Sequence, residues 1–98
     1  MRGEASIFFW RNAKNEGVDF VVREGLAVTQ LIQVCRNVSD PKTRVREVRA
    51  LLKAGAELDC ANRIILTADE DKEGESEWFG TKGTIRYMPM ADWLVAQD

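Results

Sequence analysis

The first 36 residues contain three short apolar runs of the kind that form β-strands. Ile7 to Trp10 is rich in aromatic residues, Val18 to Val22 is rich in valine, and Leu31 to Arg36 follows a turn at Glu24-Gly25. Runs of this length, joined by glycine-containing turns, are typical of neighbouring antiparallel strands. The pattern therefore predicts that the chain opens with a three-stranded antiparallel meander.

The next segment has the three- and four-residue periodicity of a helix. Asp40 can cap the free amides of a first turn, and Pro41 is tolerated there because no donor is needed. We predict a helix from Pro41 to Leu58, with Gly55 as a point that weakens it or ends it early. Its buried stripe is predicted to contain Val45, Val48, Leu51, Leu52 and Leu58. The opposite side carries a basic stripe of Lys42, Arg46, Arg49 and Lys53.

Two further strands and a short helix are predicted in the last third of the chain. Arg63 to Thr67 has the composition of a buried strand, and its position after a helix predicts a parallel, right-handed crossover connection. A turn at Gly80 and Gly83 leads to a last strand, residues 84–88, ended by Pro89. Residues 90–96 are predicted to form a C-terminal helix with Trp93 and Leu94 inward.

Charge is unevenly distributed along the chain. The formal net charge is -2, from 16 acidic and 14 basic residues. Six of the acidic residues lie between residues 69 and 77 with only Lys72 to offset them, so the rest of the chain is mildly basic. An acidic run between two apolar segments is typical of a solvated, mobile loop, and we predict a loop there.

Taken together, these elements predict one α/β (α+β) domain over residues 1–98. We expect a mixed sheet of four to five strands with an antiparallel three-strand start, one crossover helix and a short C-terminal helix. The 45% hydrophobic content is enough for one core. Without an apolar run of about 20 residues, we expect a cytoplasmic protein that does not enter the membrane.

Asp19, Gln33 and Cys35 are the candidate site residues. Gln33 and Cys35 share a face of the third strand, and pairing could bring Asp19 onto that face. Asp19 and the side-chain oxygen of Gln33 could bind Mg²⁺ or Mn²⁺, whose preferred ligands are oxygens. Alternatively, backbone amides or an arginine such as Arg36 or Arg44 hold Asp19.

The two cysteines do not indicate metal or nucleophile chemistry. Cys35 and Cys60 lie far apart, and the chain has no histidine to complete a zinc site or to activate a thiol. We expect both to be reduced residues that fill space. Trp10, Trp78 and Trp93 could stack on nucleobases, but tryptophans within apolar runs more often belong to the core.

The hairpin that contains Asp19 resembles the active-site hairpin of the PD-(D/E)XK nuclease superfamily. In that superfamily an Asp on one strand and Glu-x-Lys or Gln-x-Lys on the next hold a divalent metal, and here Cys35 takes the lysine position. Over nearly its whole length the chain resembles a C-terminal domain of unknown function appended to prokaryotic AAA-type ATPases. The segments that carry this resemblance are Arg2-Gly3, Ile7 to Arg11, Gly17 to Val22, Leu31 to Cys35, Thr43 to Leu52, Ile64 to Thr67, Ile85 to Pro89 and Trp93-Leu94.

The resemblance implies a restriction-endonuclease-like core that lacks its first helix. In active nucleases that helix supplies a further acidic residue, and this chain starts at Met1 just after the place where it would end. We therefore expect the C-terminal fragment of a larger ATPase, or a stand-alone relative, with an apolar face that self-association could cover. The chain has no phosphate loop, so the ATPase itself would be another domain.

Three functions follow as hypotheses. The first is a non-catalytic accessory domain that contacts the AAA-type ATPase domain of its parent chain, another subunit or nucleic acid. The second is a metal-dependent DNA endonuclease in which Asp19 and Gln33 hold the metal and the missing helix completes the site. The third is a weak nucleic-acid-binding module that uses the basic stripe Lys42, Arg46, Arg49 and Lys53.

Overall fold

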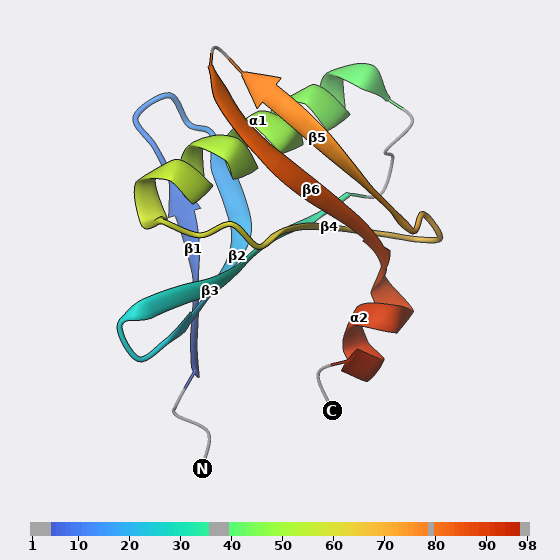
Figure 1. The fold of residues 1–98 in the computed structure, drawn as a ribbon, viewed down its shortest axis with the longest axis horizontal. Coiled ribbons are helices and arrows are strands. Elements are labelled where there is room, and N and C mark those ends of the chain that lie inside the picture. Colours follow the sequence, from blue (N-terminus) through green and yellow to red (C-terminus); the bar gives the residue numbers. More distant parts are fainter. Residues whose placement is uncertain (1–4, 36–39, 79, 97–98) are drawn as a thin grey trace.

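One mixed β-sheet, with a long helix on one face and a short helix on the other, makes up the fold (Figure 1). The computed structural model describes residues 5–35, 40–78 and 80–96. Within them the strands are β1 (Ala5–Arg11), β2 (Gly17–Glu24), β3 (Ala27–Val34), β4 (Arg63–Thr67), β5 (Lys72–Trp78) and β6 (Thr81–Pro89). The helices are α1 (Pro41–Leu58) and α2 (Met90–Ala96). The structure is therefore α+β, as predicted.

The strand order across the sheet is β1-β2-β3-β4-β6-β5. β1, β2 and β3 pair antiparallel, and α1 then crosses over so that β4 lies parallel to β3. This confirms the antiparallel start and the crossover helix. β6 is parallel to β4, and β5 is antiparallel to β6 at the outer edge. The described residues thus form six strands rather than the four to five that we predicted.

The additional strand, β5, lies in the acidic segment where the sequence predicted a mobile loop. Two of its three glutamates face cations across the pair, because Glu73 is opposite Arg86 and Glu77 is opposite Lys82, while Glu75 is opposite Thr84. Opposite charges at directly facing positions stabilise an antiparallel pair by roughly 0.2–1 kcal/mol each. Arg86 also forms an ion pair with Asp71, just before the strand. These pairings explain why an acidic segment forms an edge strand.

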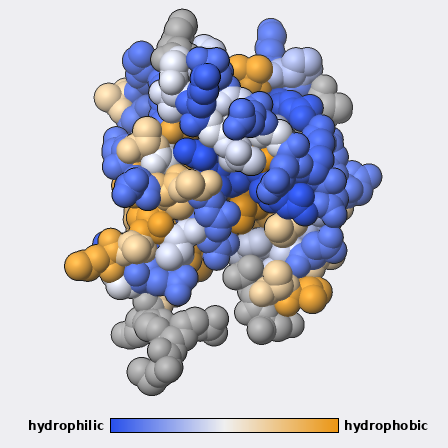
Figure 2. All heavy atoms as spheres, viewed as in Figure 1, coloured by the Kyte–Doolittle hydropathy of each residue, from blue (hydrophilic) through white to orange (hydrophobic). Residues whose placement is uncertain are grey.

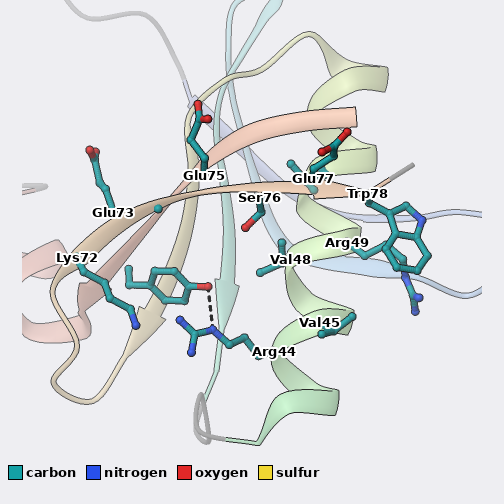
Figure 3. A pocket seen from close by; sticks show the side chains of 13 residues that line it. Arg44, Val45, Val48, Arg49, Lys72, Glu73, Glu75, Ser76, Glu77 and Trp78 are labelled. Carbon is teal, nitrogen blue, oxygen red and sulfur yellow. Dashed lines mark hydrogen bonds between the residues drawn. The ribbon is translucent and has the colours of Figure 1, made fainter. Parts of the chain in front are cut away.

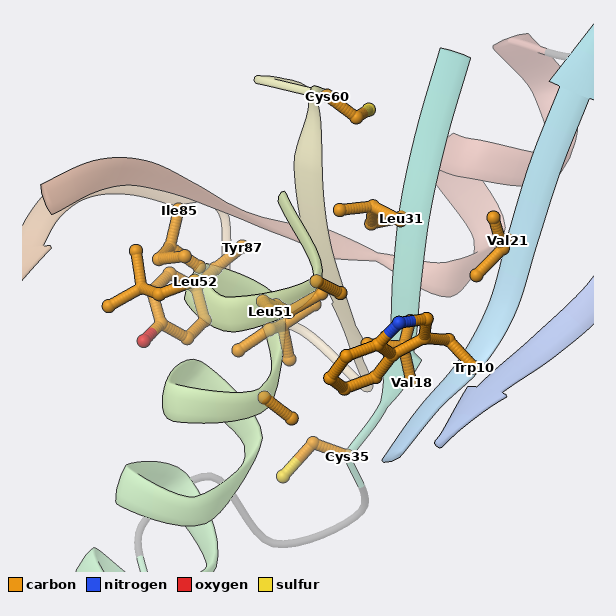
Figure 4. Close-up of a cluster of buried hydrophobic side chains, with 13 residues drawn as sticks. Trp10, Val18, Val21, Leu31, Cys35, Leu51, Leu52, Cys60, Ile85 and Tyr87 are labelled. Carbon is orange, nitrogen blue, oxygen red and sulfur yellow. The ribbon is translucent and has the colours of Figure 1, made fainter. Parts of the chain in front are cut away.

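The main core lies between α1 and the sheet (Figure 4). Leu31, Leu51, Leu52, Ile65 and Ile85 are at most 1% exposed there. Full burial of such side chains stabilises the fold by about 1.5–3 kcal/mol each. On the other face of the sheet a smaller cluster contains Val22, Ile32, Ile64 and Leu66, with Trp93 of α2 packed against it.

Most of the predicted burial is confirmed, with two corrections. Val48 and Leu58 of α1 pack against the core as predicted, but Val45 is 51% exposed because it lies beyond the sheet-facing side of the helix. Of the two α2 residues predicted to face inward, Trp93 packs against the sheet, whereas Leu94 is 56% exposed. Trp10 is buried, and its indole N–H donates to Glu57 Oε2 at 2.7 Å.

The connection between β5 and β6 also differs from the prediction. Gly83 lies within β6, opposite Ser76, and only Gly80 of the two predicted turn glycines has a turn conformation, with φ of +84°. No helix among the described residues is long and apolar enough to span a membrane.

Large apolar side chains remain at the surface at one end of the molecule. In Figure 2 hydrophobic residues come to the surface near the β2–β3 turn and at α2, while hydrophilic residues gather over β5 and β6. Ile7 and Phe9 of β1, Leu26 of the β2–β3 turn and Val95 of α2 are all at least 65% exposed. The described residues therefore expose large apolar side chains, whereas their relation to a missing first helix stays a prediction.

Gly55 does not end α1, which continues to Leu58 and closes with Asp59 in a left-handed conformation. The glycine instead allows the chain to return closely toward β4. A Cβ at this position would lie 2.8 Å from the carbonyl oxygen of Cys60 and 2.7 Å from Nε of Arg63. A glycine that weakens the helix intrinsically is thus required by the packing around it.

Gly55→Ala should therefore destabilise the protein, although alanine favours helices by about 1 kcal/mol over glycine. We expect a loss of about 1–3 kcal/mol in the free energy of unfolding, because a backbone carbonyl must move to admit the methyl group. Urea unfolding measures this loss. Gly74→Ala is the matched control, since a Cβ there meets no atom within 4 Å. A gain of stability in Gly55→Ala would contradict the close approach.

Candidate functional site

Gln33 is built into the core of the protein. It is the penultimate residue of β3 and is 0% exposed. Its Oε1 accepts the backbone N–H of Asp19 at 2.9 Å, and its Nε2 donates to the carbonyl of Gly17 at 2.7 Å and to that of Glu47 at 3.5 Å. The side chain therefore joins β2 and α1 to β3. A metal ion could use Gln33 only by breaking these contacts.

Asp19 lies beside Gln33 at the point where the ladder between β2 and β3 ends. The last paired residues are Phe20 and Ile32, and at the next position side chains rather than backbone groups form the hydrogen bonds between the strands. Asp19 Oδ2 accepts the backbone N–H of Val34 at 2.9 Å, just as Gln33 accepts that of Asp19. The hypothesis that a backbone amide holds Asp19 is confirmed, although its side chain is exposed.

One of the two arginines suggested as partners of Asp19 makes a different contact in the described structure. Arg44 points instead to β6, where its Nε donates to the hydroxyl of Tyr87 at 3.2 Å. Arg36 lies outside the described residues.

Cys35 is a core residue. It follows the last residue of β3, where its backbone N–H donates to the carbonyl of Leu66 at 2.9 Å. It is 4% exposed and belongs to the cluster between the sheet and α1 (Figure 4). Gln33 and Cys35 do share a face, as predicted, and Cys60 is buried with no disulfide between the two cysteines. The position that the resemblance places at the nuclease lysine thus has a small buried side chain.

The structure brings Glu47 of α1 close to Asp19, a pairing that sequence analysis missed. Both residues line a hollow of about 360 Å³ together with Lys14 and Arg46. Burial raises the pKa of Glu47 above its usual value, the nearby charge of Asp19 raises it further, and Arg46 acts in the opposite direction. Asp19 and Glu47 come together because α1 crosses over β2, and no sequence motif carries that information.

Glu16, Asp19 and Glu47 all line this hollow, and Glu16 is already paired with Arg49 and Lys53. Asp19 and Glu47 are therefore the carboxylates that could hold a divalent cation here. The residues that the structure describes contain no group of three or more His, Cys, Asp or Glu arranged to hold a metal ion. Mg²⁺ bound by two carboxylates would keep waters as its remaining ligands. The arrangement is therefore a minimal one, without the contribution from Gln33 that the sequence suggested.

The basic stripe of α1 is divided by Glu16 of the β1–β2 connection. Lys53 Nζ lies 2.7 Å from Glu16 Oε1, and Arg49 Nε lies 2.6 Å from Glu16 Oε2. Lys42 and Arg46 are exposed. Half of the predicted nucleic-acid-binding stripe therefore serves to hold the first hairpin against the helix.

These contacts also change the acidity of Glu16. Hydrogen bonds from the side chains of Asn12 and Lys53 lower the pKa of Glu16 from 4.5 to about 2. The folded protein thus favours the charged form of this carboxyl, whose side chain is only 9% exposed.

Glu16→Gln should lower the free energy of unfolding at pH 7 by about 1–3 kcal/mol, because two cations lose their charged acceptor. The stabilisation by Glu16 is complete above the unfolded pKa near 4.5 and is lost as the pH falls toward 2. Urea unfolding at pH 7, 5 and 3 should therefore show the difference between wild type and variant shrinking with acidification. An equal difference at pH 7 and pH 3 would contradict this.

Gln33→Glu should destabilise the fold at pH 7 by about 3 kcal/mol or more, because a carboxylate would be buried against two carbonyl oxygens. This buried carboxyl would have a raised pKa, so stability should recover as the pH falls and a protonated oxygen can donate to Gly17. Gln30→Glu is the control, since the Gln30 side chain accepts from Trp93 on the other face of the sheet. Thermal unfolding from pH 7 to 4.5 measures both variants, and a rescue of Gln33→Glu by Mn²⁺ at pH 7 would contradict a structural role.

Comparisons of this chain with protein-family models, with curated proteins and with solved structures find no match in any of the three. The resemblance to a nuclease hairpin therefore rests on the residues quoted for it. The contacts of Asp19, Gln33 and Cys35 are consequently the basis for proposing a function.

Proposed function

We propose that this chain is a non-catalytic accessory domain with a restriction-endonuclease-like fold, which serves contacts to an AAA-type ATPase domain. The observation that carries the proposal is the burial of Gln33, at 0% exposure, with its amide bonded to Asp19 and Gly17. Gln33, which the resemblance places at a metal-ligand position, thus uses its amide to join β3 to β2. A side chain whose polar atoms are used in this way is not available to coordinate a metal ion.

The identity of Cys35 supports the same proposal. Metal-dependent phosphodiester cleavage needs a cation that stabilises the attacking water and the developing negative charge. Removing one such electrostatic group typically lowers the rate by a factor of about 10²–10³. Cys35 carries no positive charge and is buried in the core, so it cannot supply this stabilisation.

The exposed apolar side chains support an interaction role. Soluble monomers rarely expose contiguous apolar patches of more than a few hundred Å² without a functional reason. Ile7 and Phe9 are each 65% exposed, and Phe20 is 45% exposed on the same side of the sheet as α2. A neighbouring domain or a second copy of the chain would cover such a face.

The alternative is a metal-dependent DNA endonuclease domain, and one observation favours it. Asp19 and Glu47 line the same hollow, and Lys14 and Arg46 lie there as well. In this alternative the two carboxylates would hold Mg²⁺ or Mn²⁺, and one of the two cations would take the role of the missing lysine. The metal would supply a Lewis acid and an activated water.

Calorimetric titration of the folded protein with Mn²⁺ and with Mg²⁺ separates these two functions. The accessory-domain proposal predicts no saturable binding to wild type in the millimolar range. Saturable one-site binding that is lost in Asp19→Asn and kept in Asp92→Asn, a control on α2, would contradict it and support the endonuclease. Cleavage of plasmid DNA with either metal, abolished by Asp19→Asn, would count against it in the same way.

A further inference from the structure

A second hollow, separate from Asp19, lies between α1 and the edge strand β5 (Figure 3). Its volume is about 590 Å³, within the range of sites that bind small organic molecules. We call it the α1–β5 cleft. It is lined by Arg44, Val45, Val48, Arg49 and Leu52 of α1, by residues 72–78 of β5 and by Tyr87 of β6.

The alternation of β5 determines which of its side chains face this cleft. Lys72 and Gly74 pair with Tyr87 and Ile85 of β6, both of which face the core under α1. Because side chains alternate along a strand, Lys72, Gly74, Ser76 and Trp78 face α1, and the three glutamates between them face away. Figure 3 shows Lys72 and Ser76 pointing toward the helix and Glu73 and Glu75 pointing away from it. The inner wall of an acidic strand is therefore free of carboxylates.

One end of the α1–β5 cleft is cationic. The Arg44 guanidinium lies 4.9 Å from the centre of the Tyr87 ring, and Lys72 Nζ lies 5.2 Å from that same centre. Arg44 Nε donates to the Tyr87 hydroxyl, the contact that is dashed in Figure 3. Within the described residues Arg44 has no salt bridge to a carboxylate, whereas Lys72 has one to Glu70 at 3.0 Å. Two cations thus converge on one tyrosine, and the carboxylate of Glu70, which lies outside the cleft lining, pairs with Lys72 and also interacts electrostatically with Arg44.

The rest of the α1–β5 cleft is apolar and aromatic. Val48 and Leu52 form its helix side, and Trp78 closes the far end with its ring 4.8 Å from the Arg49 guanidinium. Gly74 leaves the middle of the strand wall open, because a Cβ there would meet no atom within 4 Å. A planar ring would find apolar contacts and open space here.

We propose that the α1–β5 cleft binds a small ligand in which a phosphate or carboxylate is joined to a planar ring, as in a nucleoside monophosphate. The anionic group would lie at Arg44 and Lys72, and the ring would lie against Val48 and beside Gly74. Charge-assisted hydrogen bonds to guanidinium and ammonium groups are about twice as strong as neutral ones, so the cationic end orients the ligand.

The net charge of -2 does not oppose this assignment. Glu73 and Glu77 face the other side of the sheet, where Arg86 and Lys82 are directly opposite them. Their charges lie on that other face and are screened over about 8 Å at physiological ionic strength. An anion in the α1–β5 cleft would meet the cations first.

Calorimetric titration of the protein with AMP tests the proposal, with inorganic phosphate and adenosine as separate probes. We expect saturable one-site binding of AMP with a dissociation constant of about 1 mM or lower, and binding at least tenfold weaker for each separate probe. Absence of saturable AMP binding by wild type would overturn the proposal. Phosphate binding as tight as that of AMP would also overturn it, because the ring would then contribute nothing.

Two variants and one control locate the binding. Gly74→Leu places a side chain in open space within the cleft and should weaken AMP binding at least tenfold. Lys72→Gln removes one cation and should weaken it several-fold. Ala91→Leu, which adds the same side chain at an exposed position of α2 on the other face of the sheet, should leave affinity unchanged. Each variant must unfold at the wild-type temperature to within a few degrees, and AMP affinity unchanged in a folded Gly74→Leu would overturn the assignment to this cleft.

Discussion

The buried amide of Gln33 fixes the relation between the first hairpin and the crossover helix. Its oxygen and its nitrogen bond two backbone groups of β2, and the nitrogen also reaches the carbonyl of Glu47 on α1. A buried polar group left without a partner destabilises a protein by about 1–3 kcal/mol. An apolar residue at this position would leave three backbone groups without a hydrogen-bond partner. A side chain that both donates and accepts, with the length of glutamine, meets all of them.

The same hydrogen bonding explains why Asp19 faces Gln33 across the hairpin, an arrangement that resembles a metal site. The backbone ladder between β2 and β3 stops at Phe20 and Ile32. Beyond that point Asp19 and Gln33 each accept the backbone N–H on the other strand, so two polar side chains extend the pairing. Hydrogen bonding alone therefore explains why a carboxylate and an amide face one another across this hairpin. In the sequence, the same two residues suggest a metal site.

The sequence determines the elements of this fold more clearly than the roles of its polar residues. The bounds of α1 and β4 follow from the Asp40 cap, the helical periodicity and the apolar run 63–67, which are local signals. β5 was missed because its strand character lies in the alternation of glutamate with Lys72, Gly74, Ser76 and Trp78, and because the cations that compensate it are on β6. The partners of Glu16, Gln33 and Glu47 are likewise set by how α1 crosses the hairpin, and no local pattern carries that information.

The two edges of the sheet differ in a way that bears on how the domain is used. Unpaired edge strands invite association with other chains, and charged side chains along an edge discourage it. β5 has glutamates at alternate positions and pairs only with β6, so its free edge is protected. β1 pairs with β2 on one side and exposes Ile7, Phe8 and Phe9, with the guanidinium groups of Arg23 and Arg11 lying over the rings of Phe8 and Phe9. Since β5 has a row of glutamates along its length and β1 does not, the proposed accessory domain would meet its neighbour through the apolar face around β1.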